Sequence, residues 1–281
     1  MTVMVVKQRR REGRSPVGVS FVTTRVGSGD PVVLVHGIGH RRQAWDPIVP
    51  VLARHREVVA VDLPGFGESP GLPPDLPYDM PTTVQNFAKL FAELGLERPH
   101  VVGNSLGGAI ALELGAAGLV RSVTALSPAG FWDPLARRWA LTLLSTMRWA
   151  SMAPPPLIAG LARSRRLRSL AMSPVFAHPE RIGVESFVDD AALLRTSPAF
   201  GPTLAAGRDY DCFAVPDVPT LVAWGDHDRV LPPSQARRAR ERLPRARHVS
   251  LAGCGHVPMI DDPDLVTAVV LEGTTATGQR R

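Results

Sequence analysis

Short, continuous runs of valine, leucine and alanine recur along the chain, and most of them end at a glycine or a serine. Runs without polar alternation are typical of parallel strands that are covered on both faces. The strands predicted in this way span 30–37, 56–65, 98–105, 121–128, 218–225 and 246–253. A further strand is predicted over 18–27, paired with residues 2–8 through a polar loop.

Segments with apolar residues at i, i+3 and i+4 alternate with these runs, and several begin with proline or aspartate, as first helical turns prefer. Helices are therefore predicted over 42–55, 80–96, 105–118, 232–243 and 262–273. Alternating strands and helices indicate an α/β fold with a doubly wound, mostly parallel sheet. Ligands of such sheets bind in the crevice at the carboxyl ends of the strands.

One long segment interrupts the alternation. About ninety residues separate Ser127 from Val218, with helix-like stretches and no good strand pattern, and a segment of this length is not an ordinary loop. We predict a mainly helical cap inserted over the strand ends, and a disordered C-terminal tail over 273–281. The predicted organisation is a first part of the core over 1–130, the helical cap over 131–210 and a second part of the core over 211–281.

The composition indicates a folded, water-soluble protein, with 44% apolar and 21% charged residues. The net charge of +6 comes from arginine, which supplies 30 of the 32 basic residues. These arginines are scattered and accompany no nucleic-acid motif, so we expect no nucleic-acid partner. No uncharged apolar run is long enough to span a bilayer, so we expect no stable membrane insertion. Two cysteines cannot form a disulfide framework, and the N-terminal charges follow the apolar residues, the reverse of a secretory signal. We expect a cytoplasmic protein.

A serine stands between glycines where a predicted strand meets a predicted helix, in Gly103-Asn104-Ser105-Leu106-Gly107. A sharp turn at this point exposes the serine hydroxyl in a strained backbone conformation, and side chains at the two glycine positions would clash with the strand or the helix. The helix N-terminus also directs free N–H groups toward the site. The position of the pattern makes Ser105 a candidate nucleophile.

A serine hydroxyl reacts only when a base takes its proton. His256 follows the last predicted strand, in "LAGCGHVPM", and Asp228 follows the strand before it, in "AWGDHDRVLP". Either residue alone is typical of a loop. Because both stand at strand ends and in the order Ser, Asp, His, they predict a catalytic triad.

Reaction at a carbonyl also requires hydrogen-bond donors for the developing oxyanion. The glycine-rich turn "HGIGH" over 36–40 follows the first predicted central strand, and we expect the backbone N–H groups of Ile38 and Leu106 to be these donors. His36 is expected to brace the turn. Cys254 is expected to be a small buried filler. The histidines and cysteines match no metal-ligand spacing, so we expect no metal and no cofactor.

Five motifs occur in order: "VHGIG", "DLPGFGES", "GNSLGG", "WGDHDRVLP" and "GCGHVPM". In these motifs, over 30–130 and 215–272, the chain resembles esterase-like serine hydrolases of the α/β-hydrolase fold that carry a cap. The spacing G-x-x-D of that family, counted from Gly225, selects Asp228 over Asp226. Asp226 is then expected to accept hydrogen bonds from local N–H groups.

The resemblance implies hydrolysis of a carboxylic ester or related acyl substrate through an acyl-enzyme, in which Ser105 attacks, His256 transfers the proton and Asp228 orients the imidazole. Two alternatives remain open. One is a carbon–carbon bond hydrolase of the same fold acting on a vinylogous diketone, and the other is a non-catalytic ligand-binding protein that kept the fold. Dehalogenases and epoxide hydrolases of this fold use an aspartate nucleophile, and Ser105 argues against both.

The cap carries many large apolar residues between 131 and 162. Most are expected to pack within the cap, with two or three lining the pocket. We therefore expect a small apolar acyl or aryl substrate. A carbon–carbon hydrolase would need a cap arginine facing inward to hold the carboxylate of its substrate. Burial of an unpaired arginine is costly, so a solvated outer face is expected for Arg137, Arg138, Arg163, Arg165, Arg166 and Arg168.

Overall fold

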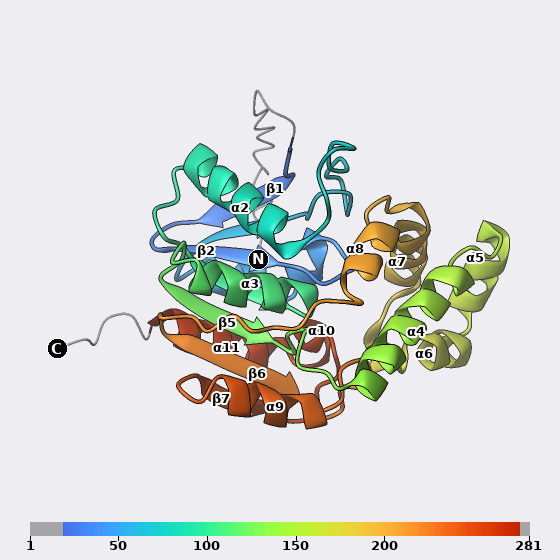
Figure 1. Ribbon diagram of the computed structural model, residues 1–281. Coiled ribbons are helices and arrows are strands. Elements are labelled where there is room, and N and C mark those ends of the chain that lie inside the picture. The colour runs from blue at the N-terminus through green and yellow to red at the C-terminus, as the bar shows by residue number, and fades with distance from the viewer. Residues whose placement is uncertain (1–18, 276–281) are drawn as a thin grey trace, which may run out of the picture.

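The structure is a computed structural model that describes residues 19–275 (Figure 1). Its centre is a seven-stranded sheet with the strand order β1-β3-β2-β4-β5-β6-β7. β1 pairs with β3 in antiparallel orientation, and every other neighbouring pair is parallel. The strands are β1 (Thr23–Gly27), β2 (Pro31–Val35), β3 (Glu57–Val61), β4 (His100–Asn104), β5 (Ser122–Leu126), β6 (Thr220–Gly225) and β7 (Arg247–Leu251).

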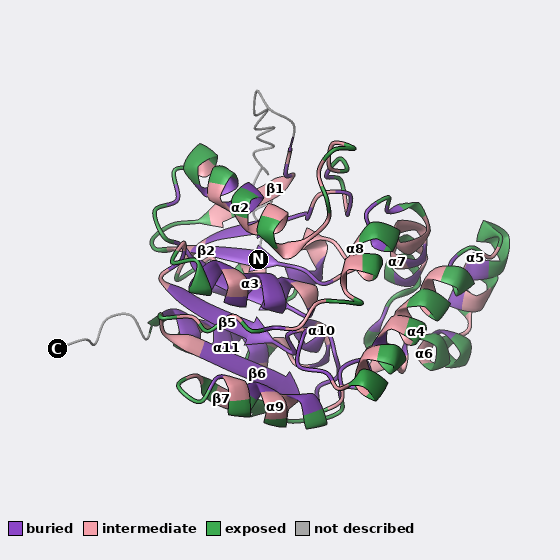
Figure 2. Cartoon of the chain, in the orientation of Figure 1, coloured by how far each residue is buried: buried purple, intermediate pink, exposed green. Residues whose placement is uncertain are grey.

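The six apolar runs are confirmed as strands β2 to β7, and burial explains why β2 to β6 lack polar alternation, whereas the edge strand β7 is buried only at Leu251. Successive side chains of a strand point to opposite faces of the sheet. In β2, Val33 and Val35 join one apolar core while Val32 and Leu34 join the other, and all four are buried. Figure 2 shows the central strands of the sheet in purple between helices whose outer sides are green. The strand predicted over 18–27 is confirmed only from residue 23 onward, and its predicted partner segment 2–8 lies outside the described residues.

Helices cover both faces of the sheet (Figure 1). One apolar core holds residues of α2, α3 and α9, and the core on the other face holds residues of α1, α10 and α11. The bounds of these helices are α1 (Val49–Leu52), α2 (Met80–Leu94), α3 (Leu106–Ala116), α9 (Ser234–Arg242), α10 (Pro258–Asp261) and α11 (Pro263–Thr275). The doubly wound sheet is therefore confirmed.

Two predicted segments differ from the structure. The helix predicted over 42–55 is interrupted, with a 3-10 helix at Arg42–Trp45 followed by the short α1. Pro47 and Pro50 lack the N–H group that a continuous helix would use at these positions. The tail predicted over 273–281 is wrong at its start, because α11 continues to Thr275 and Gly273 packs against Thr124 of β5. Residues 276–281 lie outside the described part of the chain.

A group of helices comes between β5 and β6 in the sequence, and none of the residues from 127 to 219 is in a strand. We call residues 134–206 the helical insert. It lies beside the sheet, at the right of Figure 1. α4 and α5 pack on α7, and α5 also packs on α6. Its helices are α4 (Pro134–Ala150), α5 (Pro155–Arg163), α6 (Arg165–Met172), a 3-10 turn at Pro179–Arg181, α7 (Val184–Thr196) and α8 (Phe200–Ala206). None of the helices within 19–275 combines the length and apolar character needed to cross a membrane.

Candidate active site

Ser105 occupies the turn between the central strand β4 and helix α3. Its backbone has φ +58° and ψ −116°, a strained conformation that costs about 1–3 kcal/mol in a residue with a side chain. A Cβ atom at Gly103 would lie 1.9 Å from the carbonyl oxygen of Gly107, and one at Gly107 would lie 2.1 Å from that of Val35. Only glycine fits at these two positions, as the motif predicts. The turn leaves Ser105 8% exposed.

His256 and Asp228 form a buried pair at the carboxyl ends of β7 and β6. The Nδ1 atom of His256 lies 2.8 Å from Oδ2 of Asp228. The other carboxylate oxygen accepts hydrogen bonds from the backbone N–H groups of Val230, at 3.0 Å, and Leu231, at 2.8 Å. The Asp228 carboxylate accepts a hydrogen bond from Nδ1 of His256. In this arrangement Nδ1 carries the hydrogen, and Nε2 can accept a proton. Ser105 and His256 line the same cavity.

Asn104 links the serine turn to the histidine loop. Its side-chain Nδ2 donates to the carbonyl oxygen of His256, at 2.9 Å, and to that of Leu126, at 3.2 Å. The buried amide next to Ser105 thus bonds directly to the backbone of His256. Asn104 was not among the site residues predicted from the sequence, although a polar residue at the end of an otherwise apolar strand was the available signal.

Asp261 is a second link that the sequence analysis missed. Its buried carboxylate accepts from the backbone N–H groups of Gly255, at 2.8 Å, Ala177, at 3.1 Å, and His178, at 2.7 Å. The first of these belongs to the histidine loop and the other two to the helical insert. The N–H group of His256 also donates to the carbonyl oxygen of Val175 in the insert, at 2.8 Å. The insert therefore holds the loop that carries His256.

The turn after β2 brings backbone N–H groups to the same place. Ile38 and Leu106 both line the cavity beside Ser105. Within residues 19–275, neither N–H group has a backbone acceptor. Both groups are therefore available to a ligand oxygen.

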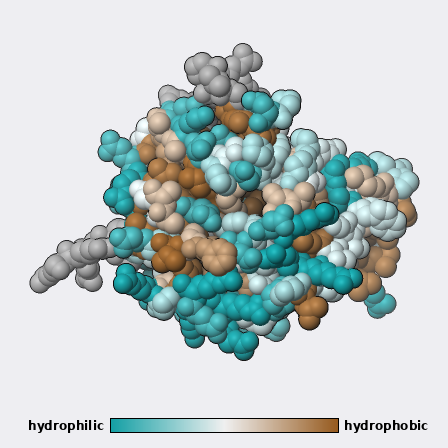
Figure 3. All heavy atoms as spheres, viewed as in Figure 1, coloured by the Kyte–Doolittle hydropathy of each residue, from teal (hydrophilic) through white to brown (hydrophobic). Residues whose placement is uncertain are grey.

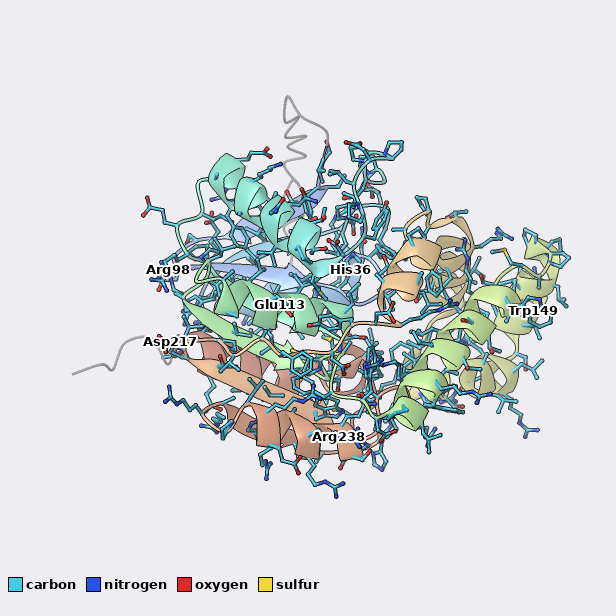
Figure 4. The ribbon with its side chains drawn as sticks, in the orientation of Figure 1. His36, Arg98, Glu113, Trp149, Asp217 and Arg238 are labelled. Atoms are coloured by element: carbon cyan, nitrogen blue, oxygen red, sulfur yellow. The ribbon has the colours of Figure 1, made fainter. Side chains whose placement is uncertain are left out.

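His36 braces this turn, as expected. Its Nδ1 bonds the carbonyl oxygen of Gly37 at 2.7 Å, and its Nε2 accepts from the N–H group of Leu63 at 3.0 Å. Complete burial lowers the pKa of His36 to about 4, so the ring is neutral at neutral pH. Figure 4 shows His36 at the end of the sheet that faces the insert.

The loop "DLPGFGES" is held by the fully buried carboxylate of Asp62. It accepts from the backbone N–H groups of Arg42, at 2.6 Å, and Glu68, at 3.0 Å, and it also pairs with the Arg42 guanidinium. A Cβ atom at Gly67 would lie 2.3 Å from the carboxyl carbon of Asp62. The second glycine of this motif therefore makes room for a structural carboxylate.

Two cavities meet at Ser105. The larger, of about 300 Å³, has mainly apolar walls from the core and the insert, and the smaller, of about 80 Å³, also includes His256. Neither cavity wall includes an arginine or a lysine among the described residues. Among the apolar candidates between 131 and 162, four line one of these two cavities, one more than the two or three expected: Trp132, Leu141, Leu144 and Met147.

The expectation that all six arginines of the insert lie on a solvated face is wrong. Arg168 is buried, because its Nε donates to the carbonyl oxygen of Ile182 at 2.8 Å and its guanidinium also bonds the carbonyl oxygen of Ala162 in the last turn of α5. Free carbonyl groups at a helix end supply the partners that its burial requires. Arg137 is half-buried and pairs with Asp211 at 2.6 Å. Most of the large apolar residues between 131 and 162 are at least partly buried, as expected, but Trp139, Trp149, Met152 and Leu157 are exposed.

The remaining candidates have structural surroundings. The exposed Asp226 accepts from the N–H group of Gly253 at 2.8 Å, which agrees with its expected role in binding loop N–H groups. Cys254 is fully buried, and burial raises the pKa of its thiol to about 12. Among residues 19–275, no cluster of three or more His, Cys, Asp or Glu side chains has an arrangement that could hold a metal ion.

A sequence model described as the alpha/beta hydrolase fold matches residues 30–263, and the chain belongs to that family. Among its relatives, the epoxide hydrolase EphH of Mycobacterium tuberculosis is 34% identical over 195 residues, which are 63% of this chain and 86% of the relative. The pimeloyl-[acyl-carrier protein] methyl ester esterase of Aeromonas hydrophila is 29% identical over 270 residues, with 90% of this chain and 98% of the relative covered.

Solved structures agree with this assignment at the level of the fold. The meta-cleavage product hydrolase of Pseudomonas fluorescens superimposes with a TM-score of 0.75 at 22% identity, covering 95% of this chain and 99% of the other. The family and its relatives establish the chain as a hydrolase of the α/β fold.

Proposed function

We propose that this protein is a serine hydrolase that cleaves a carboxylic ester with an apolar acyl or aryl group. The observation that carries the proposal is the placement of Ser105. It stands on a strained turn in the wall of a cavity shared with His256, whose Nδ1 lies 2.8 Å from the buried carboxylate of Asp228. A nucleophile, a base and an oriented acid are the three groups that acyl transfer to serine requires.

The proposed reaction has two halves. The Ser105 hydroxyl attacks the ester carbonyl while Nε2 of His256 takes its proton, and the N–H groups of Ile38 and Leu106 stabilise the oxyanion. The imidazolium then protonates the alcohol, which leaves an acyl group on Ser105. Water attacks this ester with His256 again acting as base, and the carboxylic acid is released. Asp228 holds the imidazole in the required tautomer throughout.

The cavity walls favour an apolar substrate. A volume of about 300 Å³ is at the small end of the range for ligand pockets. It fits a medium acyl chain or a single aromatic ring better than a long lipid chain. The small second cavity beside His256 is suited to the smaller part of the ester.

The alternative of carbon–carbon bond hydrolysis lacks an expected feature. Its substrate carries a carboxylate, and no arginine or lysine of the described residues lines either cavity. Burial of an unpaired carboxylate in such walls would be costly. The ester is therefore the better substrate for this site.

The named activity of the relative EphH raises epoxide hydrolysis as a second alternative. An aspartate that opens an epoxide forms an ester, which water can cleave at its carbonyl. A serine that opens an epoxide would form an ether, which has no carbonyl for water to attack. Ser105 would therefore be consumed after one turnover, and this chemistry argues for acyl transfer.

The proposal is tested with p-nitrophenyl butyrate, hexanoate and acetate and with a fluorophosphonate probe. We expect a burst of p-nitrophenol, turnover and labelling at Ser105. Ser105→Ala should lower kcat by about 10⁵- to 10⁶-fold, as loss of the nucleophile does in other triads, and should abolish labelling. Ser145→Ala, at an exposed position on α4, is the matched control and should leave both unchanged.

Three outcomes would contradict the proposal. Labelling that persists in Ser105→Ala would identify another nucleophile. Rapid bleaching of a coloured dienoate with negligible ester turnover would identify a carbon–carbon hydrolase. The absence of both burst and labelling would favour a binding protein that kept the fold.

A further inference from the structure

The charges of the helical insert are unevenly distributed. From Pro134 to Pro179 the chain contains seven arginines and no aspartate or glutamate. The nearest acidic residues on either side along the chain are Asp133 and Glu180. This part of the insert, which includes all of α4, α5 and α6, therefore presents positive charge without internal neutralisation.

The same helices expose large apolar side chains. Trp149 is 78% exposed at the end of α4, Met152 is 48% exposed in the following turn, and Leu157 is 54% exposed in α5. On α6, Leu167 and Leu170 are 47% and 71% exposed and lie one turn apart. Figure 3 shows brown spheres at the right-hand edge of the molecule, and Figure 4 places Trp149 at that edge, on the side of the insert away from the sheet.

Exposed arginines occur in the same stretch of the chain. Arg163, Arg165 and Arg166, at the junction of α5 and α6, are all exposed. None of the three has an acidic partner among the described residues. α5 has nine residues, so this junction lies about 14 Å from the α4–α5 turn that carries Met152. We call these eight residues the outer face: Trp149, Met152, Leu157, Arg163, Arg165, Arg166, Leu167 and Leu170.

We propose that the outer face docks the protein on the surface of an anionic lipid bilayer. Tryptophan and leucine side chains are stabilised at the boundary between headgroups and acyl chains, and arginines bind the lipid phosphates. The charge that is left unpaired in the protein is thus complementary to the charge of such a surface. This inference concerns a surface outside the cavities and does not rest on the proposed hydrolase activity.

Other occupants fit the outer face less well. A nucleic acid would satisfy the arginines but would leave the leucines without an apolar partner, since phosphate contacts dominate such binding. A second copy of the chain on the same face would bring the arginines of both copies together without an acidic partner. A bilayer surface satisfies the charge and the apolar side chains at once.

Docking would also place the cavity near the lipid. Leu144 and Met147 of α4 line the cavities, and Trp149 follows two residues later on the same helix. An apolar substrate dissolved in a bilayer would thus be concentrated close to the helix that forms part of the cavity wall.

The test is co-sedimentation of the full chain with vesicles. The two compositions are phosphatidylcholine alone and equal parts of phosphatidylglycerol and phosphatidylcholine. We expect binding to the anionic vesicles, weakened by high salt, and little binding to the neutral ones. The triple variant Arg163→Gln/Arg165→Gln/Arg166→Gln should lower the partition coefficient by about 100-fold, since each arginine near an anionic surface contributes about a fivefold gain. The matched control is Arg237→Gln/Arg240→Gln/Arg245→Gln, which removes the same charge from exposed positions in and beside α9 and should change the partition coefficient less than threefold.

A second pair of variants tests the apolar contribution. Trp149→Ser/Leu157→Ser/Leu170→Ser should weaken vesicle binding at least tenfold, whereas Val215→Ser, at a position that is 62% exposed before β6, should not. Circular dichroism shows whether each variant is folded. Equal losses in the two arginine variants would overturn the proposal, because net charge alone would then explain binding. Binding to DNA with the same affinity and no effect of the serine variant would identify a nucleic-acid surface instead, and no vesicle binding at all would refute docking.

Discussion

The carboxyl edge of the sheet and the outer face of the insert differ in how far contacts within the chain explain their residues. At the sheet edge, the unusual residues of the serine turn and of the His256–Asp228 pair have close neighbours that explain them. Gly103 and Gly107 leave no room for a Cβ atom, and the Asp228 carboxylate accepts from two N–H groups and faces His256. On the outer face, Trp149 and Leu170 are large, apolar and mostly exposed.

The difference shows that contacts within the folded chain explain some residues and do not explain others. Residues of the sheet edge are explained by packing and hydrogen bonds within the chain, so their substitution should damage the fold or the site. Residues of the outer face gain little from the fold, since exposed apolar side chains contribute little free energy of folding. Their explanation lies outside the chain.

After loss of the nucleophile itself, the largest expected effect is at the acid. Asp228→Asn should lower kcat by about 10³- to 10⁴-fold, because the amide favours the wrong tautomer of His256. Asp226→Asn is the matched control, two residues away and exposed, and should change kcat less than threefold. Steady-state kinetics with p-nitrophenyl butyrate measure both. A greater loss in Asp226→Asn than in Asp228→Asn would reverse the assignment.

The next effect concerns stability in acid. Burial lowers the pKa of His36 and of His100 from 6.5 to about 4. The unfolded chain takes up these protons near pH 6.5, but the folded chain takes them up only near pH 4. The contribution of the two histidines to the free energy of unfolding is therefore fully present above pH 6.5 and is lost as the pH drops toward 4. His36 alone should account for about 3 kcal/mol at most.

Urea unfolding between pH 7.5 and 4.5 measures this loss. His36→Gln keeps an acceptor and a donor without titrating, so its stability should depend less on pH than that of the wild type. His55→Gln, at an exposed position, should follow the wild-type curve. A wild-type curve that stays flat over this range would show that His36 is not held neutral by the fold.

A smaller effect is expected where the two regions meet, in the larger cavity. Each methylene group added to the acyl chain should stabilise the transition state by about 0.8 kcal/mol, a fourfold gain in kcat/KM, until the cavity is full. Butyrate or hexanoate esters should therefore exceed acetate. Leu144→Ala, which removes part of the wall supplied by α4, should move the optimum to a longer chain. Acetate as the best ester would contradict the prediction.

The smallest effect should be on the outer face. Leu170→Ser and Leu157→Ser should change the free energy of unfolding by less than about 0.5 kcal/mol. Leu112→Ala, at a fully buried position of α3, should cost about 2–5 kcal/mol. Thermal or urea unfolding compares them. A loss of more than 1 kcal/mol at Leu170 would mean that this residue belongs to the packing of the insert.

The sequence allowed the strands and most of the helices to be predicted, because each uses a repeating pattern that depends only on neighbours along the chain. The Ser105 turn could be predicted for the same reason, since its glycines are required by local backbone geometry. Asn104 and Asp261 could not be assigned roles. The partners that give them a linking role, namely the backbone groups of His256, Ala177 and His178, lie more than eighty residues away along the chain, and a polar residue in isolation does not reveal which backbone groups it will meet. Arg168 was misplaced because the acceptors that permit its burial are carbonyl groups, which no sequence pattern marks.

The bonds that join the insert to the histidine loop have a consequence for recombination among members of this family. Exchange of the insert for that of a relative would be an obvious way to change the substrate. In this chain, however, such an exchange would also replace the carbonyl group of Val175 and the N–H groups of Ala177 and His178, which hold His256 and Asp261. A chimera whose crossover lies after residue 178 should retain these bonds only if the incoming backbone supplies them. A crossover between residues 172 and 174 keeps them by construction, so the exchangeable unit is the part of the insert before Val175.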